Sequence, residues 1–379
     1  MDGPLGERSR VVIFPGFRNK RVFLTGHTGF KGAWLAHWLC ELGAEVHGFA
    51  LDPPTQPALF DQLGLARRLR DERNDIRDAA AVARSIAAAE PDFVFHLAAQ
   101  SLVRHSYAEP VATYEVNVLG TIHVLQALRS LTKPCAAVFV TTDKCYENRE
   151  WLHGYREEDP LGGHDPYSSS KAAAEIAIAS FRRSFFNPHP VKIASARAGN
   201  VIGGGDWALD RIVPDCIRAV QRDASIPIRN KLATRPWQHV LEPLSGYLWL
   251  AACLADSQLA RVPSAPLASA FNFGPSHEAN RTVSELVAEV LKHWPGRWED
   301  QSDPGAVHEA HLLQLATDKA NALLGWEPVW KFPKAIEQTV QWYREAMSHP
   351  TAIPALTSRQ IQLYAADAAT SGLPWALQA

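Results

Sequence analysis

The sequence predicts a doubly wound α/β fold with a parallel sheet and a smaller, partly discontinuous α/β second lobe. Three observations support this class. Short apolar runs alternate with amphipathic stretches through the first half, a glycine-rich turn joins the first run to the first helical stretch, and the second half becomes rich in Pro and Trp. Repeated strand–helix alternation is typical of parallel sheets whose two faces are covered by helices.

Five runs are predicted as strands because each is short, apolar and bounded by turn or polar residues. They span 21–25, 45–51, 92–97, 136–141 and 191–197. Apolar spacing predicts helices at 33–42, 78–90, 111–130 and 167–186. Later in the chain we expect helices at 212–222, 282–293 and 318–324, a short strand at 270–274, and a polar, irregular tail from about 348.

The change of character near a run of three glycines at 203–205 predicts two domains and an extension. We assign 18–199 and about 236–262 to a nucleotide-binding domain, 200–235 and about 263–345 to a substrate lobe, and 346–379 to a C-terminal extension. A chain of 379 residues, 46% of them hydrophobic, can form both cores.

Composition excludes several classes of partner. A net charge of −2 gives no basic excess for nucleic acid or an anionic membrane, and the apolar run at 246–255 is too short to span a bilayer. The first ten residues lack the apolar core of a signal peptide. The cysteines at 40, 135, 145, 216 and 253 show no paired spacing, so we expect a reduced, cytoplasmic protein. Fifteen histidines form no metal-binding motif, and we expect no metal.

The segment 25–32 (TGHTGFKG) follows the first strand and opens the first helix. Its G-x-x-G-x-x-G spacing is one residue longer than the dinucleotide fingerprint, but glycines serve both in the same way. They permit a tight turn and let backbone N–H groups approach a pyrophosphate at a helix N-terminus. A glycine-rich turn without a ligand is the alternative. The setting between strand and helix favours a Rossmann-type dinucleotide site.

Two acidic residues follow later strands. Asp52, at the end of the second strand, could accept hydrogen bonds from an adenosine ribose and would repel a 2′-phosphate, which favours NAD over NADP. Pro53 and Pro54 could instead displace Asp52, leaving it a turn residue. The pair Asp75 and Ile76 ends a third strand and could flank adenine, although a surface turn is nearly as plausible.

Two acid/base groups stand close together in the sequence. Tyr167 and Lys171 are four residues apart and share a helix face, so the ammonium could lower the pKa of the phenol and make it a base for a sugar hydroxyl. Thr142, Asp143 and Lys144 supply a second set, which a dehydration needs and plain alcohol oxidation does not. Cys145 is interpreted as packing at a strand end.

These motifs resemble the extended short-chain dehydrogenases/reductases. The resemblance rests on TGHTGFKG, HLAAQ at 96–100, NVLGT at 117–121, YSSSK at 167–171 and FNFGPS at 271–276, and it runs from about residue 20 to 343. Within that superfamily the chain most resembles the CDP-glucose 4,6-dehydratases, through SLVRHSY, TTDKCYEN, ARAGNVIGGGDWALDRIVPD and RPWQHVLEPL. Related dTDP-glucose dehydratases carry Glu where this chain has Lys144.

The resemblance implies roles for individual residues. Tyr167 would be the base at the glucose 4-hydroxyl, Lys171 its partner at the nicotinamide ribose, Thr142 a hydrogen-bond donor to the 4-oxygen and Asp143 the acid at the 6-hydroxyl. Lys144 would remove the C5 proton or stay charged and stabilise the intermediate. The implied NAD-binding residues are Gly26, Thr28, Gly29, Phe30, Lys31, Gly32, Asp52, Asp75, Ile76, Ala98, Tyr167 and Lys171. The implied contacts to a nucleotide-sugar substrate are Arg104, Tyr107, Asn200, Arg211 and Arg235.

The resemblance also implies a homodimer and a three-step reaction: oxidation at C4, loss of water across C5–C6, and return of the hydride to C6 with reprotonation of C5, so that NAD is regenerated in each turnover. The alternatives are another enzyme of the same superfamily, such as a 4-epimerase, a decarboxylase or a 4,6-dehydratase for a different nucleotide sugar. A catalytically silent NAD-binding regulator and a simple NAD-consuming dehydrogenase are less favoured. The cytosine base rests on resemblance alone.

Overall fold

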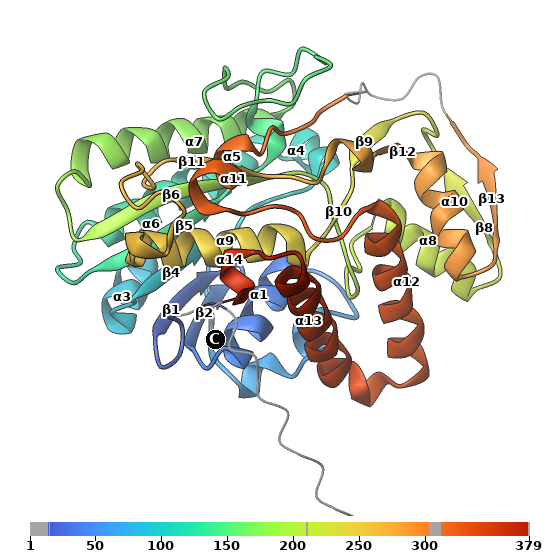
Figure 1. Cartoon of the computed structure of the whole chain (residues 1–379), viewed down its shortest axis with the longest axis horizontal. Helices are drawn as coiled ribbons and strands as arrows, with labels where there is room; N and C mark the ends of the chain where they lie inside the picture. The colour runs from blue at the N-terminus through green and yellow to red at the C-terminus, as the bar shows by residue number, and fades with distance from the viewer. Residues whose placement is uncertain (1–13, 15, 210, 303–311, 378–379) are drawn as a thin grey trace, which may run out of the picture.

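A computed structural model describes residue 14 and residues 16–209, 211–302 and 312–377. Its centre is a seven-stranded sheet in the order β11-β6-β5-β4-β1-β2-β3, with every neighbouring pair parallel (Figure 1). The strands are β1 Arg21–Thr25, β2 Glu45–Ala50, β3 Arg70–Arg73, β4 Phe93–His96, β5 Cys135–Val140, β6 Val191–Ala198 and β11 Ala270–Phe273. The strand order reverses between β1 and β4, where open α/β sheets bind ligands. The predicted fold class is confirmed.

Helices cover both faces of this sheet. One face packs against α3 Ala79–Ala89, α6 Gly120–Leu128 and α7 Pro166–Phe185, through a core that includes Phe23, Phe49 and Phe139. The opposite face packs against α1 Phe30–Glu41 and α9 Leu241–Ala255. Shorter helices complete this part: α2 Leu59–Gln62, α4 Val103–Ala108, α5 Pro110–Tyr114 and α11 Asp318–Leu324.

A second group of elements lies at one end of the molecule, at the right of Figure 1. It contains α8 Ile212–Gln221 and α10 Val283–His293 with two small sheets, β8 Ser225–Ile228 with β13 Arg297–Asp300, and β9 Thr234–Pro236 with β12 Asn280–Thr282. A third pair, β7 Val201–Ile202 with β10 Gln238–His239, follows the end of β6. β11 falls in the range assigned to the substrate lobe, but it pairs with β6 in the central sheet.

Most predicted elements are present with ends shifted by one or two residues, and two differences have a physical cause. β3 is a strand of sequence RDER, whose charged side chains gave no apolar signal. The predicted helix at 111–130 is interrupted by a π-helical turn at Glu115–Leu119, between α5 and α6. That turn holds Asn117, whose amide bonds the backbone of Gln100 and the Ser170 hydroxyl.

The expectation of an irregular tail from about residue 348 is wrong. After α12 Phe332–Ser348, the chain forms α13 Ile353–Thr370 and α14 Pro374–Leu377. α13 packs against α1, where His37 Nε2 lies 2.9 Å from Ser358 Oγ. Trp375 is fully buried and stacks on Phe14 with ring centroids 4.8 Å apart. Buried aromatic residues therefore dock this polar-looking segment on the nucleotide-binding region.

Three further sequence expectations concern absent features. The N-terminal stretch examined for a signal peptide lies outside the described residues. In the described part of the chain, no helix is long and apolar enough to cross a membrane. The apolar run at 246–255 belongs to α9, which is buried over most of its length. Among the described residues, no three His, Cys, Asp or Glu side chains gather as a metal site would require.

Candidate active site

The glycine loop lies tightly between the ends of β1 and β4. Gly26 has φ +77°, and a Cβ atom there would lie 2.7 Å from the backbone N of Ala98. A Cβ on Gly32 would lie 2.0 Å from the Gly26 carbonyl oxygen. Only glycine fits at these two positions, and the loop ends at Gly29, the N-cap of α1. This cradle at a helix N-terminus suits a dinucleotide phosphate.

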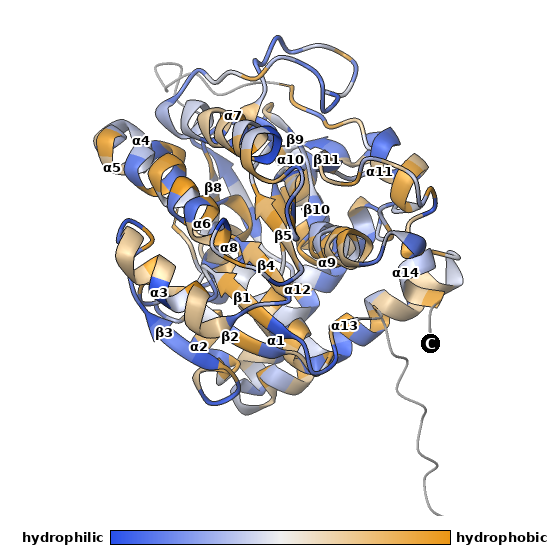
Figure 2. Cartoon of the chain, turned by 90° about the vertical axis from the view of Figure 1, so that its left-hand side faces the viewer, coloured by the Kyte–Doolittle hydropathy of each residue, from blue (hydrophilic) through white to orange (hydrophobic). Residues whose placement is uncertain are grey.

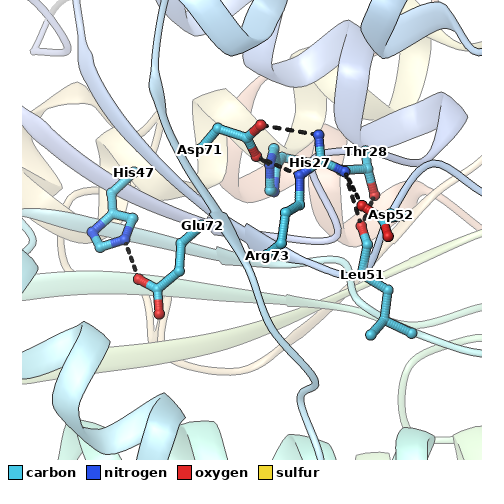
Figure 3. A network of polar contacts seen from close by, with 8 residues as sticks. All are labelled: His27, Thr28, His47, Leu51, Asp52, Asp71, Glu72 and Arg73. Atoms are coloured by element: carbon cyan, nitrogen blue, oxygen red, sulfur yellow. Dashed lines mark hydrogen bonds and ion pairs between the residues drawn. The ribbon is translucent and has the colours of Figure 1, made fainter.

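A network of polar side chains links this loop to the ends of β2 and β3 (Figure 3). His27 Nε2 lies 2.8 Å from Asp71 Oδ1, and Arg73 Nε lies 2.8 Å from the same carboxylate oxygen. Arg73 also reaches the Asp52 carboxylate at 3.4 Å, and the Asp52 side chain is 91% exposed. Thr28 Oγ1 donates to the Leu51 carbonyl at 2.9 Å. Asp71 and Arg73 were not predicted here: a strand end was expected at Asp75 and Ile76, but the charged residues before it gave no signal for a role in the site.

The two residues expected to flank adenine lie just beyond this network. Asp75 forms an ion pair with Arg77 at 2.6 Å, which lowers the pKa of the carboxyl group. Ile76 is 5% exposed and lies against Gly120 at the start of α6. Their role at the adenine stays a prediction.

The Thr-Asp-Lys triplet follows β5 and forms a 3₁₀ turn, η3 Asp143–Cys145. Asp143 is 2% exposed, and its Oδ1 accepts a hydrogen bond from Thr142 Oγ1 at 2.9 Å. Its Oδ2 is buried and meets no hydrogen-bond partner among the described residues. Burial raises the pKa of the Asp143 carboxyl, against the opposing effects of Lys144 and Arg235. Asp143 is therefore disposed to hold a proton and to present one free oxygen.

Tyr167 and Lys171 lie on the first turns of α7, whose N-terminus is capped by Asp165. Burial raises the pKa of Tyr167 to about 12, while a hydrogen bond with Thr142 opposes the shift. Burial lowers the pKa of Lys171 to about 8, and its Nζ donates to the Val140 carbonyl at 3.2 Å. We expected a lowered phenol pKa, and the structure has it raised because desolvation outweighs the opposing effects of Thr142 and Arg211.

One residue of the phosphate loop reaches farther than expected, and one residue of this site was not assigned from sequence. Lys31, expected only in the phosphate loop, reaches the catalytic region and donates to the Tyr247 hydroxyl at 3.4 Å. Burial, with the charges of Lys171 and Arg211, lowers the pKa of Lys31 to about 7. Tyr247 lies in the buried helix α9, and its pKa is raised by burial and by Tyr167 and Asp143. No sequence motif marks Tyr247, because its helix reads as uniform core.

Two of the predicted substrate contacts lie near the catalytic residues. Arg211 precedes α8, pairs with Asp206 at 2.9 Å and acts electrostatically on Tyr167. Arg235, in β9, acts likewise on Asp143. Two guanidinium groups therefore lie near the catalytic acid and base, and such groups can bind the oxygens of a diphosphate.

The other three predicted contacts differ in how closely the structure ties them to the catalytic groups. Asn200 follows the end of β6 by two residues, and its carbonyl accepts a hydrogen bond from Gln238 N at 3.2 Å. Arg104 and Tyr107 are exposed on α4, which packs against α7. Their contacts to a substrate stay predictions.

Trp237 and His239 belong to the RPWQHVLEPL segment that also contains Arg235, and both are buried. Trp237 donates to the Arg281 carbonyl at 3.0 Å, and His239 packs between Trp34 and Trp330. The structure thus gives both residues a packing environment.

A known protein family matches most of this chain. Residues 23–339 match the family model described as GDP-mannose 4,6 dehydratase. The chain belongs to this dehydratase family. One member, the CDP-glucose 4,6-dehydratase of Salmonella typhimurium, is 47% identical over 337 residues, which cover 86% of this chain and 91% of that protein. A dTDP-glucose 4,6-dehydratase of Streptomyces antibioticus is 29% identical over 339 residues, covering 86% and 92% of the two chains.

Solved structures of other enzymes share the fold of this chain. A dTDP-glucose 4,6-dehydratase from Streptomyces venezuelae, solved with NAD, superimposes with a TM-score of 0.73 at 24% identity, over 86% of this chain and 98% of that one. The UDP-glucose 4-epimerase of Thermus thermophilus, also solved with NAD, gives a TM-score of 0.72 at 25% identity, over 86% and 99%. Dehydratases and epimerases thus share this scaffold, so the reaction must be argued from the site.

Proposed function

We propose that this chain catalyses the NAD-dependent dehydration of CDP-D-glucose to CDP-4-keto-6-deoxy-D-glucose. The observation that carries the proposal is the meeting of two acid/base sets. Thr142 donates to the buried acid Asp143 and lies close enough to Tyr167 to influence the pKa of its phenol, so both sets can act on one hexose. The relative that is 47% identical is named a CDP-glucose 4,6-dehydratase, which supports cytidine as the nucleotide.

The residues of the glycine loop fit NAD, because the cradle between Gly26, Gly32 and Ala98 leaves no space for side chains. We assign NAD contacts to Gly26, Thr28, Gly29, Phe30, Lys31, Gly32, Asp52, Asp75, Ile76, Ala98, Tyr167 and Lys171. NAD, when bound, would accept a hydride from C4 and return it to C6. Asp71, together with Asp52, places two carboxylates around Arg73, which supports NAD over a cofactor that carries a 2′-phosphate.

Each catalytic side chain then has one task. Tyr167 takes the proton of the 4-hydroxyl, and Lys171 stabilises the phenolate with its charge. Asp143, whose carboxyl pKa is raised by burial, delivers a proton to the departing 6-hydroxyl. Lys144, half-buried beside Asp143, removes the C5 proton or stabilises the resulting enolate. Of these two roles, we favour removal of the C5 proton.

We assign the substrate's phosphates and nucleotide to Asn200, Arg211 and Arg235, with Arg104 and Tyr107 near the sugar. The Arg211 and Arg235 charges already act on Tyr167 and Asp143, which supports their place in the site. A guanidinium fork matches two oxygens of a phosphate group.

Exposed apolar residues of α5, of the π-helical turn before α6 and of α7 support a homodimer. Val111, Leu119 and Ile176 are exposed by 71%, 48% and 58%, and Tyr114 and Phe185 by 39% and 42%. Figure 2 shows hydrophobic stretches along α5 and α6 on one side of the molecule. A second copy of this chain would cover them, and a monomeric mass in solution would contradict this assignment. All five cysteines are free, in keeping with a reducing, cytoplasmic location.

Incubation with NAD and each of CDP-, UDP-, GDP- and dTDP-glucose tests the proposal by product mass. We expect loss of one water from the CDP sugar alone, without net accumulation of NADH. An unchanged mass with inversion at C4 would identify an epimerase instead. Net NADH would identify a simple dehydrogenase, and dehydration of another nucleotide sugar would correct the assigned base.

A further inference from the structure

A buried ion pair lies directly behind the catalytic residues. Glu175 of α7 and Arg197 of β6 meet at 2.8 Å, with side chains that are 2% and 4% exposed. Glu175 follows Lys171 by one helical turn and lies on the same face of α7. None of the chemical steps assigned above uses this pair, so its presence needs another explanation.

The carboxylate of the pair binds the residue that precedes the catalytic triplet, here called its first flank. Thr141 Oγ1 donates to Glu175 Oε1 at 2.6 Å, and Ser195 Oγ donates to Oε2 at 2.8 Å. Thr141 is the residue immediately before Thr142. Glu175 therefore attaches the start of the triplet to the helix that carries Tyr167 and Lys171.

The guanidinium of the pair binds the residue that follows the 3₁₀ turn, here called the second flank. Arg197 Nη1 donates to the Tyr146 hydroxyl at 2.8 Å and to the Glu157 carbonyl at 3.0 Å. Tyr146 follows Cys145, the last residue of the 3₁₀ turn, and its hydroxyl donates to Asn272 Oδ1 at 2.7 Å. Asn272 belongs to the FNFGPS motif, and none of the roles assigned above uses its side chain.

Charge and burial favour a single arrangement of this ion pair and its hydrogen bonds. Burial alone would raise the pKa of Glu175, but Arg197 and the hydroxyls of Thr141 and Ser195 lower it, so the carboxylate stays ionised. A buried ion pair adds little to stability in comparison with well-packed apolar residues, and its best-attested benefit is to fix one arrangement of the chain. Here it fixes the turn that carries Asp143 and Lys144.

We propose that Glu175 and Arg197, acting through Thr141 and Tyr146, are positioning residues that set the Thr142–Lys144 turn in register with Tyr167 and Lys171. The pair thereby couples elimination to oxidation on one sugar. This inference rests on the proposed dehydration, because only a dehydratase needs both acid/base sets together. Neither Glu175 nor Arg197 is assigned to the substrate.

Thr141→Val tests this positioning role, because it removes one hydroxyl from Glu175 and keeps the size of the side chain. Rapid mixing of the NAD-loaded variant with CDP-glucose follows the rise and decay of enzyme-bound NADH. The rise reports oxidation at C4, and the decay reports elimination with hydride return. We expect a rise within about 2-fold of wild type and a decay slowed about 10-fold or more, since small misplacements cost large factors in rate.

Three further variants make the comparison specific. Thr141→Ser restores the hydroxyl and should recover the decay, and Tyr146→Phe, which removes the second flank, should slow it as Thr141→Val does. Thr339→Val removes a buried hydroxyl that donates to the Ala335 carbonyl in α12, and should change neither phase. Equal slowing of both phases by Thr141→Val, or no slowing, would overturn the inference. Wild-type enzyme that forms no dehydrated product would overturn the proposed function and this inference with it.

Discussion

Two ion pairs lie at opposite ends of the proposed NAD site, and both have 2.8 Å between charged atoms. At the catalytic end, Glu175 and Arg197 are 2% and 4% exposed. At the adenosine end, Asp71 and Arg73 are 17% and 30% exposed and connect to Asp52 near the surface. The two pairs have the same distance between charged atoms but different exposure to water. They should therefore respond differently when one partner is replaced.

Burial decides what each pair can do. Near the surface, water screens charge and side chains can reorient, so Arg73 and Asp52 can adapt when a ribose binds. Behind the active site, each polar atom of Glu175 has a fixed protein partner, and loss of one leaves a charge without compensation. The adenosine end is thus suited to recognition, and the catalytic end to holding a geometry.

Replacement of one acid at each end measures this contrast directly. Glu175→Gln leaves the buried Arg197 guanidinium uncompensated, and we expect it to lower the free energy of unfolding by about 3–5 kcal/mol. Asp71→Asn keeps an acceptor for His27 and should cost about 1 kcal/mol or less, because its pair with Arg73 is partly hydrated. Denaturant midpoints of the two variants, with the slopes checked for equality, give both values.

A similar loss for the two variants would show that burial does not distinguish the pairs. Asp215→Asn is a matched control, because Asp215 pairs with Arg218 on α8 at 24% and 22% exposure, away from both ends of the site. Its effect should resemble that of Asp71→Asn.

Lys144 is only half-buried, unlike the buried Asp143 and Lys171, so its role can be tested separately. Lys144→Ala should slow exchange of the C5 hydrogen with solvent deuterium by about 10²-fold, as expected for loss of a general base. Oxidation at C4 should change far less, because Tyr167 and Lys171 remain. Equal slowing of both steps would remove the special role assigned to Lys144. Lys133→Ala, on an exposed lysine far from the triplet, should leave both rates unchanged.

The apolar strands and the glycine loop could be predicted because each signal is local. A run such as RVFLT at β1 fixes strand and burial together, and the structure has it at the same residues. β3 gave no such signal, since its residues are charged and its strand pairing depends on β2. The C-terminal helix α13 was missed for a related reason, because its buried residues face partners distant in sequence.

The catalytic motifs were also local, but what surrounds them was not. Tyr167 and Lys171 follow from one helix, whereas the burial that raises one pKa and lowers the other depends on how the rest of the fold packs around them. The Glu175–Arg197 pair had a weak signal that could have been used. Arg197 is a charge inside an apolar strand, and Glu175 repeats the face of Lys171. A buried charge requires a partner, which only the sheet order reveals.

The pH dependence of the reaction gives the smallest expected effect and tests the catalytic end without altering its fold. Burial lowers the pKa of Lys171 to about 8, so its ammonium loses a proton as the pH rises through that value. The charged form assists Tyr167, and kcat/KM for CDP-glucose at saturating NAD should therefore fall about 10-fold by one pH unit above 8. Lys171→Arg keeps its charge, so its weaker activity should show no such fall. Lys133→Arg, at the surface, should keep the wild-type profile, and a descending limb retained in Lys171→Arg would assign the titration to another group, with Lys31 as the first candidate.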